Sequence, residues 1–238
     1  KKFQKKSINK KIYYKKILNL LIKIKNIKTK YQKTFLKTNY KVPDYSLKKL
    51  LDESNLFLDW YLPKYVKRGK SRILKIKFNK IFKKLLNNIY YKNKVFVHRD
   101  FHISNLMITK KGLGLIDSQD AVYGNIAYDL ASLIDDVRFK TDVKTKKYIF
   151  DEFIKKNKQL NLKKFKNDFE ILSVLRNLKI IGIFTRLSVR DKKNKYLKLI
   201  PHAWELIDYR TLNNPIFKDL NYLLSKNFDR KIRKSYEN

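Results

Sequence analysis

The sequence predicts an α+β protein that is mainly helical and carries a small β-rich insert. Apolar residues recur at helical spacing near the start and again after residue 127, whereas the runs between about 95 and 116 are short and β-rich. The 238 residues are 43% hydrophobic, which is enough for a buried core. Because no glycine- or serine-rich linker and no internal repeat interrupts the chain, a single domain over residues 1–238 is predicted.

The first part of the chain is expected to be helical. From Ile12 onward, the apolar positions Ile17, Leu20, Leu21 and Ile24 recur at helical spacing. Pro43-Asp44 and Ser46 are typical of a turn and a helix cap, and the apolar pattern after them predicts a helical pair that continues towards Pro63. A further helix is expected over residues 72–91.

The β-rich insert consists of the runs 95–97, 106–108 and 113–116, which are too short for helices. After it the helical period returns from Ala127. Further helices are expected near residues 142–157, 165–188, 196–209 and 215–226. Residues 1–10 are interpreted as a basic tail or a hinge remnant, and residues 230–238 as a basic C-terminal tail.

The formal net charge of +37 is typical of proteins that bind nucleic acids, anionic membranes or acidic ligands. Here the lysines are scattered along the whole chain and accompany many Ile, Asn and Tyr residues, so we attribute them to compositional bias and expect no nucleic-acid or membrane partner. A basic nucleic-acid or membrane-surface module with a decayed catalytic site is the alternative.

The chain contains no cysteine, which excludes disulfides, thiolate catalysis and cysteine metal sites. No apolar run approaches the length that spans a bilayer, and a cytoplasmic protein is therefore predicted. The oligomeric state is left open.

The candidate chemistry lies in the insert, within the run VFVHRDFHISNLMI. Asp100 follows one predicted strand and Asn105 precedes the next, while Asp117 stands at the end of the strand in LGLIDSQD. Magnesium prefers oxygen ligands, and phosphoryl transfer needs a carboxylate that orients the attacking hydroxyl and receives its proton. The spacing therefore predicts Asp100 as the catalytic base, with Asn105 and Asp117 as ligands of Mg²⁺ on the nucleotide phosphates.

Three neighbouring residues have more open roles. His98 and Arg99 complete the His-Arg-Asp motif and are grouped with Asp100 as catalytic-loop residues. For His98 a packed scaffold position is favoured over proton transfer. For His102 a substrate-facing role and a surface position stay open.

These motifs resemble the aminoglycoside phosphotransferase superfamily, whose members have a protein-kinase-like fold and phosphorylate small-molecule hydroxyls. Within it, the chain is most similar to the anomeric sugar kinases of N-acetylmuramate and N-acetylglucosamine, from about residue 12 to about 210. The similarity is carried by HRDFHISNLMI, by GLGLIDSQDAVYGNIAYDLASLIDDVR and by RNLKIIGIFTRL. The resemblance implies the mainly helical C-terminal lobe of a kinase-like enzyme, with the catalytic loop on a β-hairpin insert.

The resemblance also implies ATP as phosphoryl donor, Mg²⁺ as metal and an amino sugar 1-phosphate as product, in cell-wall recycling. It places Asp129 as a support of the catalytic loop through backbone N–H groups, with a charge interaction at a helix N-terminus as the alternative. Trp60, Arg138 and Arg186 are candidates for the sugar pocket, since sugar rings stack on aromatic faces and sugar hydroxyls need donors. A core position for Trp60 and solvated charges for the arginines are the alternatives.

The chain departs from this family in two places. Ser118 stands where relatives generally have Phe after the metal-binding Asp, which removes an apolar anchor but no metal ligand. The first glycine is Gly69, and everything before it is interpreted as helix or basic coil, so no glycine-rich phosphate loop precedes the catalytic loop. The N-terminal nucleotide lobe is therefore expected to be absent through truncation, and the isolated chain to turn over barely.

A second candidate function keeps the superfamily but changes the substrate to an aminoglycoside, choline or another amino alcohol. Cationic substrates require an acidic pocket. Asp120, Asp135 and Asp136 are the residues that could supply it.

Overall fold

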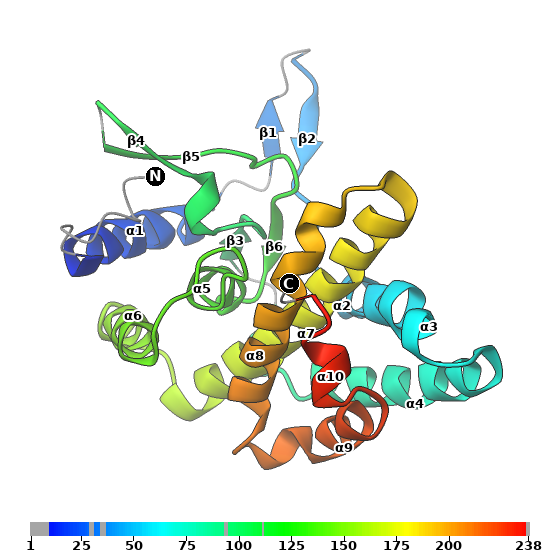
Figure 1. Ribbon diagram of the computed structural model, residues 1–238. Coiled ribbons are helices and arrows are strands. Elements are labelled where there is room, and N and C mark those ends of the chain that lie inside the picture. The colour runs from blue at the N-terminus through cyan, green and yellow to red at the C-terminus, as the bar shows by residue number, and fades with distance from the viewer. Residues whose placement is uncertain (1–9, 29–30, 34–36, 93–94, 111, 237–238) are drawn as a thin grey trace. The chain divides into compact units, whose positions relative to one another are not determined.

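The structure is a computed structural model that describes residues 10–28, 31–33, 37–92, 95–110 and 112–236. These residues fall into two compact units: unit 1 is Lys1–Tyr45 with Tyr91–Phe165, and unit 2 is Ser46–Tyr90 with Lys166–Asn238. Helices dominate the described residues, and the sheets among them are all two-stranded (Figure 1). The mainly helical α+β composition is therefore confirmed, whereas the single domain over residues 1–238 stays a prediction.

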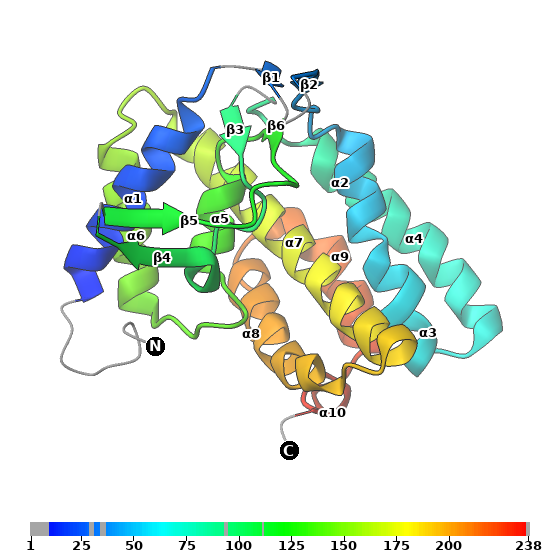
Figure 2. The same cartoon turned by 90° about the horizontal axis from the view of Figure 1, so that it is seen from above.

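Among the described residues, three α-helices lie wholly within unit 1, together with the strands. They are α1 (Lys10–Lys25), α5 (Tyr128–Ile134), α6 (Val143–Lys155), β1 (Tyr31–Lys33), β2 (Asn39–Lys41), β3 (Val95–Val97), β4 (Leu106–Thr109), β5 (Gly112–Leu115) and β6 (Val122–Gly124). α1 buries Ile17, Leu21 and Ile24, as their helical spacing predicts, whereas Leu20 is half-buried and Ile12 is exposed. It packs against α6 and β3, and Figure 2 shows the β4–β5 hairpin beside it, where α1 contacts β5.

The strands of unit 1 form antiparallel pairs. β3, which precedes the catalytic loop, pairs with β6, and Val97 at the end of β3 lies opposite Val122 of β6. In the β4–β5 hairpin, Leu106 lies opposite Leu115. β1 pairs with β2, so the expectation of only helix or coil before Gly69 was wrong. β2 is exposed along its length and therefore lacks the apolar alternation that reveals a half-buried strand.

Unit 2 is helical. It contains α2 (Leu47–Ser54), a π-helical segment (Phe57–Tyr61), α3 (Leu62–Tyr65), α4 (Arg68–Asn87), most of α7 (Leu162–Asp191), 3₁₀ segments at Asn194–Leu199 and Pro215–Phe217, α8 (Ile200–Thr211), α9 (Lys218–Asn227) and α10 (Arg230–Arg233). Ser46 caps α2, because its hydroxyl accepts a hydrogen bond from the Lys49 N–H at 3.1 Å. Asp229 caps α10 through the Ile232 N–H at 2.8 Å. Interpreting this C-terminal segment as a basic tail was therefore wrong for Arg230–Arg233.

The core of unit 2 is organised by an aromatic cluster of Phe57, Tyr61, Trp204 and Phe228, all buried. The rings of Phe57 and Trp204 lie 5.8 Å apart at their centroids in an edge-to-face arrangement. The indole N–H of Trp204 donates to the Tyr61 hydroxyl at 3.1 Å, which satisfies a buried donor. Within the described part of the chain, no helix is both long and apolar enough to cross a bilayer.

Candidate active site

The catalytic loop of unit 1 begins where β3 ends at Val97 and leads into the 3₁₀ turn Ile103–Asn105 and β4. His98 is buried, whereas Asp100 is exposed. The carboxylate of Asp129, buried on α5, accepts hydrogen bonds from the backbone N–H groups of His98 at 2.7 Å and Arg99 at 2.9 Å. Hydrogen bonds to an ionised carboxylate are strong, so this contact fixes the start of the loop on α5.

Asn105 directly precedes β4, and Asp117 follows shortly after β5, so both residues lie at the open end of the β4–β5 hairpin. The side-chain N–H₂ of Asn105 donates to the backbone carbonyl of Asp100 at 3.1 Å, and the Asn105 carbonyl accepts from the Ile116 N–H at 3.1 Å. Asp117 follows directly and is exposed. These contacts bring the end of the hairpin to the catalytic loop.

Both loops contain a residue in the left-handed backbone region. Arg99 has a φ of 73° and Asp117 a φ of 63°. Non-glycine residues adopt this region at a cost of about 1–3 kcal/mol, and such residues cluster at functional sites. Two of the four described non-glycine residues in this region, Arg99 and Asp117, are therefore among the catalytic and metal-binding residues that the sequence predicts, whereas Lys37 and Lys192 are not.

His98 is surrounded by both predicted loops. Burial lowers the pKa of His98, while backbone groups of Ile116 and Asp100 and the carboxylates of Asp100 and Asp117 act in the opposite direction. Because both carboxylates act on the same imidazole, Asp100 and Asp117 share one neighbourhood. A buried, neutral imidazole suits a scaffold position, although the role of His98 stays a prediction. His102 is also buried, so the surface position considered for it was wrong.

The donor atoms fit a hard divalent cation such as Mg²⁺. Because the Asn105 N–H₂ donates to the loop, its Oδ1 is the atom that can bind a cation, and Asp117 adds an exposed carboxylate. Among the described residues no group of three or more His, Cys, Asp or Glu side chains could hold a metal. A site that combines one amide and one carboxylate with substrate phosphates, as Mg²⁺ sites commonly do, is compatible with that finding.

The three candidates for the sugar pocket are divided between the units. Trp60 lies half-buried in the π-helical segment of unit 2, and Arg186 lies on α7 in unit 2 with its Nε buried and without a hydrogen-bond partner among the described residues. Arg138 belongs to unit 1 and is exposed; its backbone N–H donates to Asp136 at 2.9 Å. Their contact with a sugar stays a prediction.

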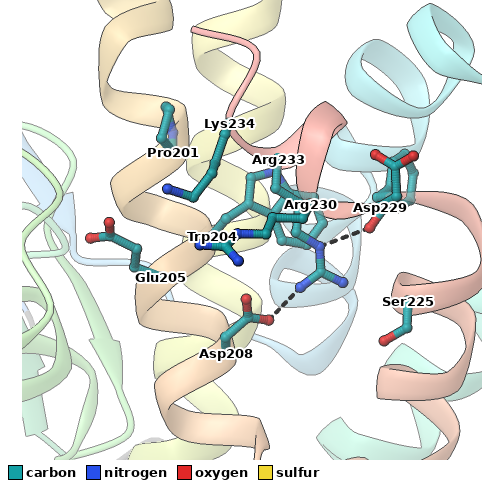
Figure 3. A pocket seen from close by; sticks show the side chains of 10 residues that line it. Pro201, Trp204, Glu205, Asp208, Ser225, Asp229, Arg230, Arg233 and Lys234 are labelled. Atoms are coloured by element: carbon teal, nitrogen blue, oxygen red, sulfur yellow. Dashed lines mark hydrogen bonds and ion pairs between the residues drawn. The ribbon is translucent and has the colours of Figure 1, made fainter. Parts of the chain in front are cut away.

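A pocket of about 360 Å³ lies in unit 2 and is lined by residues between Pro201 and Lys234 (Figure 3). In the sequence these residues are far from the predicted catalytic residues. The pocket lining includes Trp204, Asp208 and Arg233. The Arg233 guanidinium pairs with Asp208 and lies 4.6 Å from the centre of the Trp204 ring, so its charge and the ring face are already engaged. None of the residues predicted for catalysis or metal binding lines this pocket.

The sequence did not single out Tyr45 and Tyr128, and it indicated Asp120 only as a possible acidic residue. In the structure the side chains of Tyr45 and Asp120 both contact Arg99. The position of Asp120, three residues after Asp117 and at the end of a turn, was the available signal. No sequence pattern marks the two tyrosines, because their contact joins segments far apart in the chain.

Comparison with known proteins connects these loops to a family. Residues 37–154 match the phosphotransferase enzyme family, APH. An N-acetylmuramate/N-acetylglucosamine kinase of Neisseria meningitidis serogroup B is 36% identical over 169 residues, which cover 67% of this chain and 50% of that protein. Proteins of the same name from Pseudomonas aeruginosa and Pseudomonas putida are 28% and 27% identical, over 77% and 78% of this chain and 56% of each relative. The chain thus spans about half the length of the curated relatives it matches.

The matched segment contains both loops of the candidate site, with Asp100 and Asp117, and the Asp129 carboxylate that anchors the catalytic loop. The resemblance predicted from the His-Arg-Asp motif and the two hairpin ends is confirmed. The chain belongs to the phosphotransferase enzyme family.

Proposed function

We propose that this chain carries the catalytic residues of an ATP-dependent phosphotransferase that acts on a hydroxyl of an amino sugar. The observation that carries the proposal is the exposed Asp100 on a loop held by Asp129, with Asn105 bonded to that loop and Asp117 at the end of the adjoining hairpin. The names of the relatives from Neisseria and Pseudomonas support N-acetylmuramate or N-acetylglucosamine as acceptor. A sugar 1-phosphate destined for cell-wall recycling is the proposed product.

Each loop residue has one proposed task. Asp100 orients the acceptor hydroxyl and receives its proton, which an exposed carboxylate on an anchored loop can do. Asn105 and Asp117 would hold Mg²⁺, which when bound neutralises charge on the nucleotide phosphates. His98 and Asp129 keep the catalytic loop in place. Trp60, Arg138 and Arg186 are proposed to contact the sugar.

An aminoglycoside, choline or amino-alcohol substrate is less compatible with the described residues. Asp135 is fully buried and paired with Lys146 at 2.7 Å, and Asp136 is buried as well. Of the acidic residues expected to line a cationic pocket, only Asp120 is exposed. The burial of the other two disfavours an acidic substrate pocket made from this set.

Metal titration tests the proposed site directly. Since loss of a residue that merely supports a metal ligand costs about 10–100-fold in metal affinity, Asp117→Asn should weaken binding at least about tenfold. Mn²⁺ is the probe, followed by paramagnetic relaxation of water protons. The control is Asp151→Asn on the exposed face of α6, where Asp151 only pairs with Lys147. Equal Mn²⁺ affinity in both variants would refute the metal site.

The acceptor is tested separately with ³¹P NMR. N-acetylglucosamine, N-acetylmuramate, choline and an aminoglycoside are each incubated with ATP, Mg²⁺ and the full-length natural protein that contains these residues. We expect phosphorylation of an amino sugar at its anomeric hydroxyl. Turnover of choline or the aminoglycoside alone would replace the proposed acceptor with the second candidate.

A further inference from the structure

The guanidinium of Arg99 contacts two segments outside its own loop. Its Nη1 donates to the backbone carbonyl of Asp120 at 3.1 Å and lies 3.8 Å from the Asp120 carboxylate. On the other side, the guanidinium carbon lies 5.3 Å from the centre of the Tyr45 ring. The Arg99 side chain is only 14% exposed, although Asp120 is 63% exposed. Arg99 is therefore partly enclosed rather than a solvated surface charge.

The backbone of Arg99 is held independently of its side chain. Its N–H donates to the buried Asp129 carboxylate at 2.9 Å, and its φ of 73° places it in the left-handed region. A non-glycine residue stays in that region only where its surroundings hold it there. The direction of the Arg99 Cα–Cβ bond is consequently fixed by the same turn that precedes Asp100.

The aromatic side of this contact is also fixed. The Tyr45 hydroxyl donates to the Tyr128 hydroxyl at 3.0 Å, and the two rings meet edge to face with centroids 5.0 Å apart. The Tyr45 N–H donates to the Tyr123 carbonyl on β6 at 2.7 Å. Tyr45 thus offers Arg99 a ring face that cannot easily turn away.

The partner segment, by contrast, is exposed. Residues 117–120 follow β5 on the solvent side, and the Ala121 N–H closes a turn on the Ser118 carbonyl at 3.1 Å. All four residues, from Asp117 to Asp120, are exposed. The polar contact from Arg99 to Asp120 therefore holds residues 117–120, whose own side chains are exposed and contribute little to packing.

We propose that Arg99 is a positioning residue that ties the metal-binding loop to the catalytic loop, so that Asp117 is held in register with Asp100 and Asn105. This inference rests on the proposed function for its catalytic meaning, although the tie itself does not. Since the carboxylate of Asp120 is 3.8 Å away and exposed, the ion pair contributes little. The backbone hydrogen bond and the ring contact carry the interaction, and the Arg99 guanidinium makes both.

These contacts predict different effects for variants of Arg99 and of Asp120. Arg99→Gln should release the loop, because glutamine is shorter and uncharged and cannot form the cation–π contact. Arg99→Lys should release the loop less, because lysine keeps the charge and a donor but lacks the planar guanidinium. Asp120→Asn should have little effect, because the accepting backbone carbonyl remains. Arg190→Gln is the matched control, since the exposed Arg190 pairs, among the described residues, with its neighbour Asp191 on α7 of unit 2.

Two readouts test the tie. The first is amide hydrogen exchange of a peptide spanning residues 117–124, which includes the bonded Ala121 N–H. Loss of one hydrogen bond and one cation–π contact should raise the exchange of this peptide about tenfold in Arg99→Gln and by less in Arg99→Lys. The second is Mn²⁺ affinity, which should fall by a similar factor. Asp120→Asn and Arg190→Gln should stay within about twofold of the native protein in both.

The outcomes separate this inference from the proposed function. Unchanged exchange in Arg99→Gln, or faster exchange spread evenly over α5 and α6, would overturn the tie. So would a loss in Asp120→Asn that equals the loss in Arg99→Gln, because the ion pair would then be the important contact. If the native protein binds no Mn²⁺, the proposed metal site fails, and the exchange measurement alone decides the tie.

Discussion

The Asp100→Asn variant is expected to lose phosphoryl transfer by about 10²–10⁴-fold while it keeps the native fold. General-base catalysis contributes a factor of that size, and asparagine can still accept a hydrogen bond but cannot take up the proton. Asp100 is exposed, so the change buries no unpaired group. The loss should therefore appear in kcat far more than in the stability of the protein.

The measurement is steady-state turnover of the amino sugar in the full-length natural protein, with the melting temperature followed in parallel. Asp151→Asn makes the same chemical change at an exposed ion pair on α6 and should leave turnover unaltered. Comparable turnover in Asp100→Asn and Asp151→Asn would remove Asp100 from the mechanism.

Gly182→Ala is expected to destabilise unit 2 by about 3 kcal/mol, although alanine is the better helix former. A Cβ at Gly182 on α7 would lie 2.3 Å from the backbone carbon of Leu56 and 2.5 Å from the Phe57 nitrogen. Backbone atoms cannot rotate away as a side chain can. The π-helical segment begins at this contact, with Phe57, so the two elements would have to move apart.

Thermal unfolding measures this effect, and a loss of about 3 kcal/mol corresponds to a drop in Tm of about 6–12 °C. The control is Gly69→Ala in α4, where a Cβ would meet nothing within 4 Å. Helix propensity alone should then raise stability by up to about 1 kcal/mol. The two substitutions are chemically identical, and a rise in Tm for both would contradict the close approach of α7 to Leu56.

The sequence predicted the elements whose signals are local. The helix after Ser46 was expected from its cap, and α1 from the apolar face of Ile17, Leu21 and Ile24; both are confirmed. β6 was missed, because Val122–Gly124 has only three residues and is defined by its pairing with β3, far away in the chain. The π-helical segment has no sequence signature of its own.

The candidate site shows the same division. Asp100, Asn105 and Asp117 were identified because they flank short strands in a recognisable order, and the structure brings the Asn105 side chain to the Asp100 carbonyl. Their chemical roles stay predictions. The contact of Arg99 with Tyr45 could not be predicted from the sequence. It depends on the hydrogen bond between the Tyr45 N–H and the Tyr123 carbonyl on β6, which joins segments far apart in the chain.

The aromatic cluster of unit 2 also determines what intrinsic fluorescence can report. The chain has two tryptophans, Trp60 and Trp204, and both belong to unit 2. Tryptophan emission should therefore follow the loosening of the ring cluster around Trp204 and be largely insensitive to melting of the loops in unit 1. A tryptophan introduced at exposed Tyr40 on β2 would give unit 1 an emission signal of its own.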